Sequence, residues 1–385
     1  MNRLPSFIIF LIIFHSLYGL LHFYFYRKLV RALDMGSISH LLLIVILCFL
    51  LLSFIISNML TDEAPFLLTN ILAYISHIWM GALFLFFSIN LLIDIYRLII
   101  YVSARFFSPV FARYLPGDKV TFVVTLLIIA GIIIYGMFEA GNIVVENIKI
   151  RTAKLPPRMD MLRVVQISDI HFSVLNDLKL AKKIGEIIKD LQPDILVSTG
   201  DLIDSGLRDK ELVASVFRDI KTTYGKYASA GNHEFISGIK EAVEFIEKAG
   251  FKMLRNESVS VKNFLNIAAI DDPTSRRFGT ASNVSEDKIL KALSREHLNI
   301  FLKHQPRVDN NSIGKFDLQL SGHTHKGQIF PFTLIVSQFY SYLDGLHKVG
   351  NDSYLYVSRG TGTWGPPIRF LTFPEITVID FERKE

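Results

Sequence analysis

Cysteine is almost absent from this chain of 385 residues: the single one, Cys48, lies in an apolar run. The region from about residue 150 onward therefore has no thiol, which excludes disulfide bonds and thiolate metal ligands there. No internal repeat is present, which argues against a transporter built of two inverted halves. The formal net charge is only +5, and several basic residues lie in short loops between apolar runs. Orientation in a bilayer explains those residues better than a nucleic-acid partner does.

Apolar residues are abundant, and they are concentrated before residue 140. The mean hydropathy of +0.36 is too high for an ordinary soluble enzyme. A helix needs about 20 residues to cross a hydrocarbon core of ~30 Å, and four runs reach that length: 5–26, 39–60, 67–92 and 120–138. A signal peptide is the alternative for the first run, but no small-residue cleavage site follows it, which favours an uncleaved span. Residues 1–140 are therefore predicted to form an all-α transmembrane region of four helices, multi-pass in the cell membrane.

The charges of the connections predict an orientation. The connection after the second run contains Asp62 and Glu63 and no basic residue, whereas the first and third connections are basic. Cytoplasmic loops are enriched in lysine and arginine, so the first and third connections should be cytoplasmic and the region after the fourth run extracytoplasmic. The basic residues that follow the last run favour the opposite orientation; they are Lys149, Arg151, Lys154 and Arg158.

The remainder of the chain has the pattern of an α/β domain. Residues 143–150 and 162–167 are predicted to be two strands joined by a turn at Pro156-Pro157. Helical and strand-like apolar patterns then alternate, with a helix before Pro193, a buried strand at 195–197 and further helices around residues 212–220 and 239–246. This alternation is typical of a layered α/β fold. We expect a linker and first strand over 141–160 and one domain over 161–385.

Polar residues follow several of the predicted strands. Asp169, Asp201 and Asn232 each come shortly after a strand, and His323 follows the apolar run 318–320. Ligands of open α/β sheets collect at the carboxyl ends of strands. Residues far apart in the sequence are therefore expected to converge on one crevice.

Five of the seven histidines beyond residue 140 fall in short segments that also contain acidic or amide side chains. Each segment alone is a weak signal, because a strand-end aspartate is commonly a helix cap and a histidine commonly a surface residue. Their order and their positions after strands make the set specific. The segments are Asp169-Ile170-His171, Gly200-Asp201, Gly231-Asn232-His233-Glu234, Lys303-His304-Gln305 and Gly322-His323-Thr324-His325.

This residue set fits a hydrolytic site with two divalent metal ions, which together neutralise phosphoryl oxygens and activate water as a nucleophile. Asp201 has two carboxylate oxygens and is the natural bridge between the ions. The first ion would also be bound by Asp169, His171 and His325, and the second by Asn232, His304 and His323. Imidazole, carboxylate and amide ligands without thiolate favour Mn, Fe, Zn or Co. His233, next to a ligand, is the candidate catalytic residue that protonates the leaving oxygen or stabilises the transition state.

In this order, the five segments resemble those of the calcineurin-like metallophosphoesterase superfamily. The resemblance covers roughly residues 160–381, and Gly327-Gln328 with the tail from Arg359 to Ile376 resembles its bacterial membrane-anchored branch. It implies an αββα sandwich of two sheets and the metal-ligand roles given above. Lys326 departs from this branch, whose members often have glycine there; it places a cation beside the site and is a candidate substrate-binding residue.

Other candidate residues have competing interpretations. Arg359 and Trp364 are candidates for the wall of a substrate pocket, with the arginine binding phosphate, but a surface arginine and a packing tryptophan explain them equally well. The aromatic-rich stretch 330–346 is compatible with lipid contact, although packing on the sheet is favoured. Glu234 and Glu375 are interpreted as structural partners.

The sequence therefore predicts a membrane-anchored phosphoesterase with a phosphate-containing small molecule or lipid as its substrate. The substrate class within the superfamily is open between lipid-linked or envelope pyrophosphates, cyclic nucleotides and general phosphodiesters. The alternative is a non-catalytic membrane sensor or transporter with a metal-binding ligand domain, which predicts a broken ligand set or polar spans. A structural envelope protein would leave the ordered histidines unexplained.

Overall fold

The computed structural model describes residues 4–60 and 65–384, which form two compact units. One unit holds the described residues up to Phe138 together with Pro366–Ile368. The other holds Glu139–Gly365 and the described residues from Arg369 onward.

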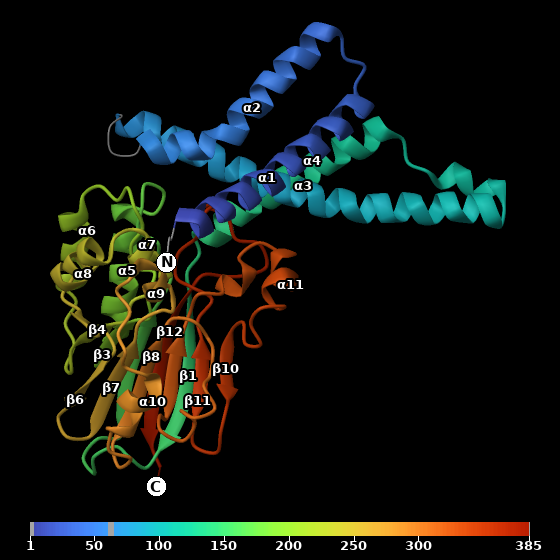
Figure 1. Cartoon of the computed structure of the whole chain (residues 1–385). Coiled ribbons are helices and arrows are strands. Elements are labelled where there is room, and N and C mark those ends of the chain that lie inside the picture. Colours follow the sequence, from blue (N-terminus) through green and yellow to red (C-terminus); the bar gives the residue numbers. More distant parts are fainter. Residues whose placement is uncertain (1–3, 61–64, 385) are drawn as a thin grey trace. The chain divides into compact units, whose positions relative to one another are not determined.

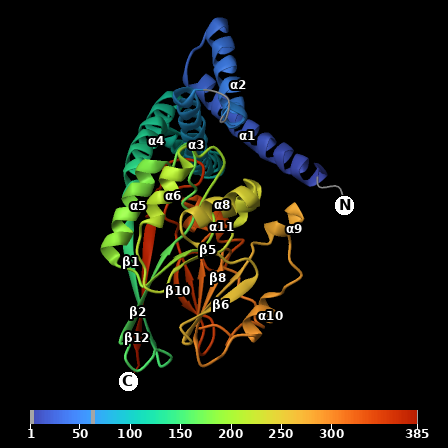
Figure 2. The ribbon, with the colours of Figure 1, turned by 90° about the vertical axis from the view of Figure 1, so that its left-hand side faces the viewer.

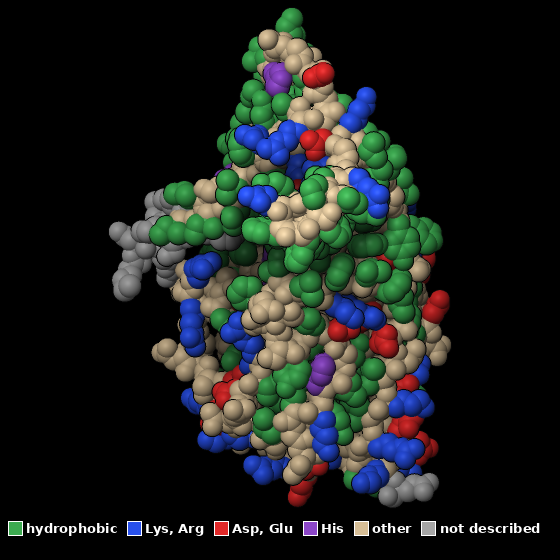
Figure 3. Space-filling model, turned by 90° about the vertical axis from the view of Figure 1, so that its right-hand side faces the viewer, with side chains coloured by type: hydrophobic (Ala, Val, Ile, Leu, Met, Phe, Trp, Pro, Cys, Tyr) green, Lys and Arg blue, Asp and Glu red, His purple; other side chains and the backbone are tan. Residues whose placement is uncertain are grey.

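The N-terminal unit is helical (Figure 1). Many of its large apolar side chains are exposed, including Ile12 (59%), Leu41 (63%) and Leu92 (69%), and Figure 3 shows hydrophobic side chains on the surface of the helices. Such surfaces are stable in contact with lipid. The elements are α1 (Leu4–Ala32), α2 (Ser37–Leu60), α3 (Phe66–Phe106), the short 3₁₀ helix η1 (Pro109–Tyr114) and α4 (Asp118–Ala140).

Three stretches of the described residues are long and apolar enough to cross a membrane: Ser37–Ser57, Leu67–Phe106 and Asp118–Ala140. The prediction of four transmembrane helices is not confirmed. Residues 5–26 lie in α1, but this helix is not one of the three, and the side chains of several of its first residues lie outside the described part. The third predicted span is longer than expected. No glycine or proline interrupts the chain between Gly81 and Pro109, so α3 continues to Phe106 and includes Arg97 and Arg105, which we had placed in a loop.

Ionisable side chains in these helices have polar partners. Lys28 and Tyr24 of α1 both donate to the carboxylate of Asp94 in α3, the tyrosine hydroxyl at 2.7 Å. The indole Nε1 of Trp79 donates to Nε2 of His22 at 2.9 Å. Because each contact joins two helices, these groups serve interhelical packing.

The C-terminal unit contains two six-stranded mixed sheets, in the orders β1-β12-β2-β3-β4-β5 and β10-β11-β9-β8-β7-β6 (Figures 1 and 2). The strands of the first are β1 (Val144–Thr152), β2 (Met161–Ile167), β3 (Ile195–Ser198), β4 (Lys226–Ala228), β5 (Lys252–Met253) and β12 (Glu375–Arg383). Those of the second are β6 (Glu257–Val261), β7 (Leu265–Ile270), β8 (Leu298–Lys303), β9 (Leu318–Ser321), β10 (Gly345–Lys348) and β11 (Tyr354–Val357). The helices are α5 (Leu178–Leu191), α6 (Lys210–Arg218), α7 (Asn232–Ile236), α8 (Ile239–Lys248), α9 (Thr274–Phe278), α10 (Glu286–Lys291), η2 (His325–Gly327) and α11 (Phe332–Val336).

The two sheets share one hydrophobic core. Val164 and Val197 of the first sheet pack in the same buried cluster as Ile300 and Leu320 of the second. A second cluster joins the other side of the first sheet to α5, α6 and α8, and a smaller one joins β7 and β8 to α10. The unit is therefore a two-sheet α/β sandwich with helices on its outer faces, as the resemblance implied.

The strands predicted at 143–150 and 162–167 are β1 and β2, and they do not pair with each other. β12 lies between them, parallel to β1 and antiparallel to β2. The nine-residue strand Glu375–Arg383 is buried along most of its length. Its insertion buries more apolar surface than a two-stranded hairpin could, and such a distant pairing carries no local sequence signal.

Candidate metal centre

The predicted ligands lie just beyond the carboxyl ends of five strands. Asp169 follows β2, Asp201 follows β3, and Asn232 begins α7 four residues after β4. In the second sheet, His304 follows β8 directly and His323 follows β9. Strands β2, β3 and β4 are parallel to one another, as are β8 and β9. Their loops therefore open at the same edge, as the rule for open α/β sheets requires.

The backbone at these loops is unusual. Five predicted ligands have a left-handed backbone conformation, which costs a non-glycine residue about 1 kcal/mol or more and is concentrated at functional sites. They are Asp169 (φ 53°), His171 (φ 55°), Asp201 (φ 52°), His323 (φ 73°) and His325 (φ 45°).

Two glycines of the motifs leave room for the carboxylates. A Cβ on Gly231 would lie 2.2 Å from Oδ1 of Asp201, and one on Gly322 would lie 2.1 Å from Oδ2 of Asp169. No side chain fits at these distances. The glycines are therefore required because the chain passes directly against the buried acids.

The first group of donors comprises Asp169, His171 and His325. Nε2 of His171 lies 3.1 Å from Nε2 of His325, which lies 3.5 Å from Oδ1 of Asp169. One donor atom from each residue falls within 4.8 Å of the others. All three side chains are buried, with exposures of 0%, 2% and 6% in chain order for Asp169, His171 and His325.

The second group comprises Asp201, His304 and His323, and Asn232 lies beside it. Nε2 of His304 lies 3.1 Å from Oδ2 of Asp201, from Oδ1 of Asn232 and from Nδ1 of His323. The same Oδ2 of Asp201 lies 3.8 Å from Nε2 of His171 in the first group. Asp201 is thus situated between the two groups.

The chemistry of these donors fits divalent cations. The Nδ1 atoms of His171 and His304 are engaged by Asp204 (3.2 Å) and by the carbonyl of Thr199 (2.8 Å), which directs both Nε2 atoms into the groups. Burial, reinforced by His304, lowers the pKa of His323 to about 3, so that this ring is neutral near pH 7. Buried carboxylates are stable only when paired with cations or hydrogen-bond donors. Burial also lowers the pKa of His325, which lies beside Asp169. Burial alone would lower the pKa of His304 too, but Asp201 outweighs it and raises that pKa well above its usual range, so a metal ion would take the place of this proton.

His233 forms a third donor cluster with His171 and Asp201, in which one donor atom from each residue falls within 4.8 Å of the others. Its backbone N–H donates to Oδ1 of Asp201 (2.8 Å), and its Nδ1 lies 2.5 Å from Oδ1 of Asp204. Burial alone would lower the pKa of His233, but the carboxylates of Asp204 and Asp201 outweigh it and raise the pKa to about 10. The backbone contact with Asp201 and the Nδ1 contact with Asp204 both leave Nε2 of the His233 ring unengaged.

Asp204 is a functional residue that we did not predict. It contacts the Nδ1 atoms of both His171 and His233 with its two carboxylate oxygens. The sequence contains a signal for it, because Asp204 follows Asp201 by three residues in the same loop. Carboxylates that accept from the outer nitrogen of a metal-binding histidine orient its ring.

Arg369 was also missed. It is fully buried, and its guanidinium donates to the carbonyls of Gly360 (3.1 Å) and Gly362 (2.6 Å) and lies 3.3 Å from Nδ1 of His325. Burial lowers its pKa to about 10. This arginine holds the tail loop against the first group of donors. Its signal was a lone cation among apolar and proline residues at 366–371.

Glu234 has the structural role that we expected. Its carboxylate accepts from the backbone N–H groups of Gly231 (2.7 Å), Asp201 (2.9 Å) and Leu202 (2.7 Å). Because it joins two ligand-bearing loops, Glu234 fixes the position of Asp201 relative to Asn232.

Comparison with known proteins agrees with this geometry. The family model of the calcineurin-like phosphoesterases matches residues 162–327. An uncharacterized metallophosphoesterase of Aquifex aeolicus is 33% identical over 251 residues, which are 65% of this chain and 96% of that protein.

This chain belongs to the calcineurin-like phosphoesterase family.

One relative is similar over nearly the whole chain, the helical unit included. An uncharacterized metallophosphoesterase of Campylobacter jejuni is 29% identical over 391 residues, covering 98% of this chain and 100% of that protein. A transmembrane protein with metallophosphoesterase domain from Danio rerio is 30% identical over 269 residues, covering 67% of this chain and 62% of its own. The three apolar helices and these relatives indicate a membrane protein.

The candidate substrate-binding residues of this chain have different surroundings. The guanidinium of Arg359 is paired with the carboxylates of Glu375 and, at 3.0 Å, Glu146, so its charge is already neutralised. This pairing argues against the phosphate-binding role that we considered. Lys326 pairs with Asp344 at 2.8 Å. Trp364 is 51% exposed, and its ring lies 6.2 Å from that of His233, which favours the substrate-pocket interpretation over packing.

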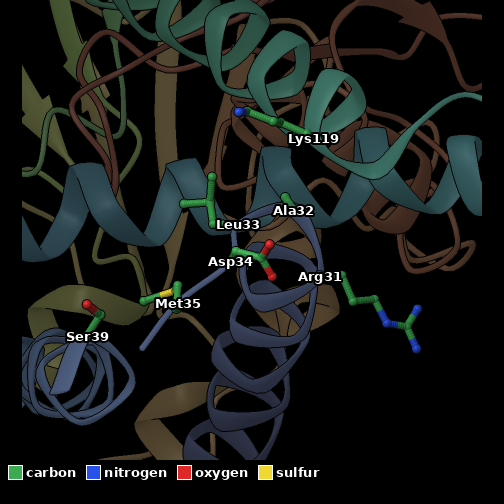
Figure 4. Close-up of a pocket in the computed structure, with 7 residues that line it drawn as sticks. All are labelled: Arg31, Ala32, Leu33, Asp34, Met35, Ser39 and Lys119. Carbon is green, nitrogen blue, oxygen red and sulfur yellow. The ribbon is translucent and has the colours of Figure 1, made fainter. Parts of the chain in front are cut away.

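A separate cavity of about 670 Å³ lies in the helical unit (Figure 4). It is formed by the end of α1 and the following loop, the first turn of α2 and the start of α4, and it contains none of the predicted ligands. Its lining residues are Arg31, Ala32, Leu33, Asp34, Met35, Ser39 and Lys119.

Proposed function

We propose that this phosphoesterase is a membrane-anchored hydrolase that uses two divalent metal ions to cleave phosphoester or pyrophosphate bonds. One observation supports this most strongly: Asp201 belongs to two of the three donor clusters, one with His171 and one with His304 and His323. Its Oδ2 lies 3.8 Å from Nε2 of His171 and 3.1 Å from Nε2 of His304. A single structural ion would require only one such cluster. The mixture of imidazole, carboxylate and amide donors favours Mn, Fe, Zn or Co.

In this proposal the ligands divide between two ions. Asp169, His171 and His325 hold the first, Asn232, His304 and His323 hold the second, and Asp201 bridges them. When bound, the ion pair would neutralise phosphoryl oxygens and supply an activated water for attack on phosphorus. Glu234 and the motif glycines keep the bridging carboxylate in place.

His233 is proposed as the catalytic residue that donates a proton to the leaving oxygen. Its Nδ1 is held by Asp204, so Nε2 is the atom available to a substrate. Only 16% of its side chain is exposed, which is enough for contact with a bound phosphate ester and limits access of bulk water. The adjacent indole of Trp364 would form one wall of the pocket.

The location and substrate class follow from the apolar helices. With α1 counted as a span, basic residues in the last turns of α1 and α3 and in the connection after α3, namely Arg31, Arg105 and Arg113, favour a cytoplasmic position for those ends. The C-terminal domain is then extracytoplasmic in the cell membrane. An enzyme tethered there meets lipid-linked and envelope phosphates at high local concentration. We therefore propose a substrate of that class, with Lys326 at the edge of its binding site.

The test is the replacement of the bridging carboxylate. Asp201→Asn should abolish hydrolysis of a chromogenic phosphodiester by the full chain in Mn²⁺, while the protein stays in the membrane fraction. Asp190→Asn, at an exposed position of α5, is the matched control and should retain full activity. Undiminished turnover by Asp201→Asn would contradict the bridging role of this carboxylate. If the metal-loaded wild type hydrolysed none of the phosphate esters and pyrophosphates tested, a non-catalytic ligand-binding domain would be favoured instead.

A further inference from the structure

The loop that bears His323 and His325 is fixed to the helix that follows it. The hydroxyl of Thr333 in α11 donates to the carbonyl of Lys326 at 2.8 Å. Gly327 has a φ of +77°, and a Cβ there would lie 2.5 Å from both N and Cα of Thr333. The loop and α11 therefore touch through backbone atoms, without an intervening side chain.

The chain returns from α11 to the metal centre through Tyr340. The backbone N–H of Tyr340 donates to the carbonyl of Val336, the last residue of α11, at 3.1 Å. Its hydroxyl lies 2.7 Å from Nε2 of His323, and the two rings meet edge to face with centroids 5.2 Å apart. The guanidinium of Arg307 lies over the tyrosine ring, 5.1 Å from its centroid. Tyr340 is thus held from both sides.

The hydrogen bond between Tyr340 and His323 determines which ring nitrogen of His323 has a lone pair for a metal ion. Nδ1 of the ring faces the second donor group, 3.1 Å from Nε2 of His304. A neutral imidazole carries its proton on one nitrogen, and the hydrogen bond made by one nitrogen determines the role of the other. When the Tyr340 hydroxyl accepts from Nε2–H, the proton stays on Nε2 and the Nδ1 lone pair points into the group.

We propose that Tyr340 is a positioning residue for the second metal ion: it fixes the ring orientation and the tautomer of His323. This inference rests on the proposed dimetal function. It also gives the apolar stretch 330–346 a role beyond packing, because that stretch carries a side chain to a ligand from outside the five motif segments.

Tyr340→Phe is the decisive variant, because it keeps the ring over which Arg307 lies and removes only the hydroxyl, which contacts His323 and Arg307. Tyr342→Phe is the matched control: Tyr342 lies two residues further on, and its ring packs 4.8 Å from that of His347, which is not among the proposed ligands. Both replacements conserve the side-chain volume almost completely.

The experiment uses the full chain in detergent and measures Mn²⁺ binding by competition with a chromogenic chelator, together with turnover as a function of Mn²⁺ concentration. Loss of an outer hydrogen-bond partner typically weakens metal binding about 10- to 100-fold. We expect Tyr340→Phe to bind the weaker of two Mn²⁺ ions at least about tenfold less tightly, and its turnover to recover at saturating Mn²⁺. Tyr342→Phe should match the wild type.

Two results would overturn this inference and leave the proposed function intact. In the first, the wild type binds two ions and Tyr340→Phe binds them equally tightly. In the second, Tyr340→Phe has a turnover defect that saturating Mn²⁺ does not restore. A wild-type chain that binds no ion pair would instead overturn the proposed function, and this inference with it.

Discussion

Replacing Asp204 with asparagine removes the negative charge that His171 and His233 share. The two carboxylate oxygens now accept from both rings, at 3.2 Å for Nδ1 of His171 and 2.5 Å for Nδ1 of His233. An asparagine side chain has one acceptor oxygen and one NH₂ donor. One imidazole would therefore keep its acceptor, and the other would face a donor and change its tautomer or rotate.

The magnitude follows from which ring loses its partner. If the amide oxygen faces His233, then His171 is misdirected and the first ion binds about 10- to 100-fold less tightly, or about 1.4 to 2.7 kcal/mol. If the oxygen faces His171, metal binding persists and turnover falls by a similar factor. Either way, turnover at limiting metal should fall at least about tenfold. The binding isotherm distinguishes the two cases.

The assay is phosphodiester turnover and Mn²⁺ binding by the detergent-solubilised full chain, with Asp190→Asn as the control for loss of one surface carboxylate. Asp204→Asn with wild-type turnover and wild-type metal affinity would refute the claim that this carboxylate orients the two histidines. Equal losses in Asp204→Asn and Asp190→Asn would point to a nonspecific charge effect and refute it as well.

Three further predictions test separate parts of the account. His233→Ala should lower turnover about 100-fold or more with metal content preserved, as expected for loss of a proton donor; loss of metal measured by elemental analysis would reassign His233 as a ligand. Gly327→Ala should lower the thermal unfolding temperature more than Gly314→Ala does, because both glycines have positive φ but only the first would place a Cβ 2.5 Å from backbone atoms; equal shifts would show that the close contact with Thr333 is unimportant. A reporter fused to the C-terminus should be active only outside the cytoplasm, and cytoplasmic activity would reverse the proposed orientation.

The structure brings together the ligand candidates that sequence reasoning selected, and the reason is local. Asp169, Asp201 and His323 come two or three residues after apolar strands, and parallel strands in a sheet carry such residues to a common edge. Secondary structure alone was therefore enough to predict their convergence. The alternation of strands and helices likewise predicted a layered α/β domain.

The missed residues act through contacts that no local pattern records. Arg369 lies 44 positions from His325, and Tyr340 reaches His323 only because α11 folds back on the metal loop. The pairing of β12 between β1 and β2 joins chain segments more than 200 residues apart. Such contacts depend on the tertiary fold, so a single sequence indicates the residue types and not their partners.

The most direct test of the central claim is the metal content of the purified full chain, determined by elemental analysis after preparation without chelators. The account predicts two transition-metal ions per chain in the wild type and fewer than two in Asp201→Asn, with hydrolysis lost on chelation and restored by Mn²⁺. Active wild-type protein that holds no metal, or only one ion per chain, would contradict it.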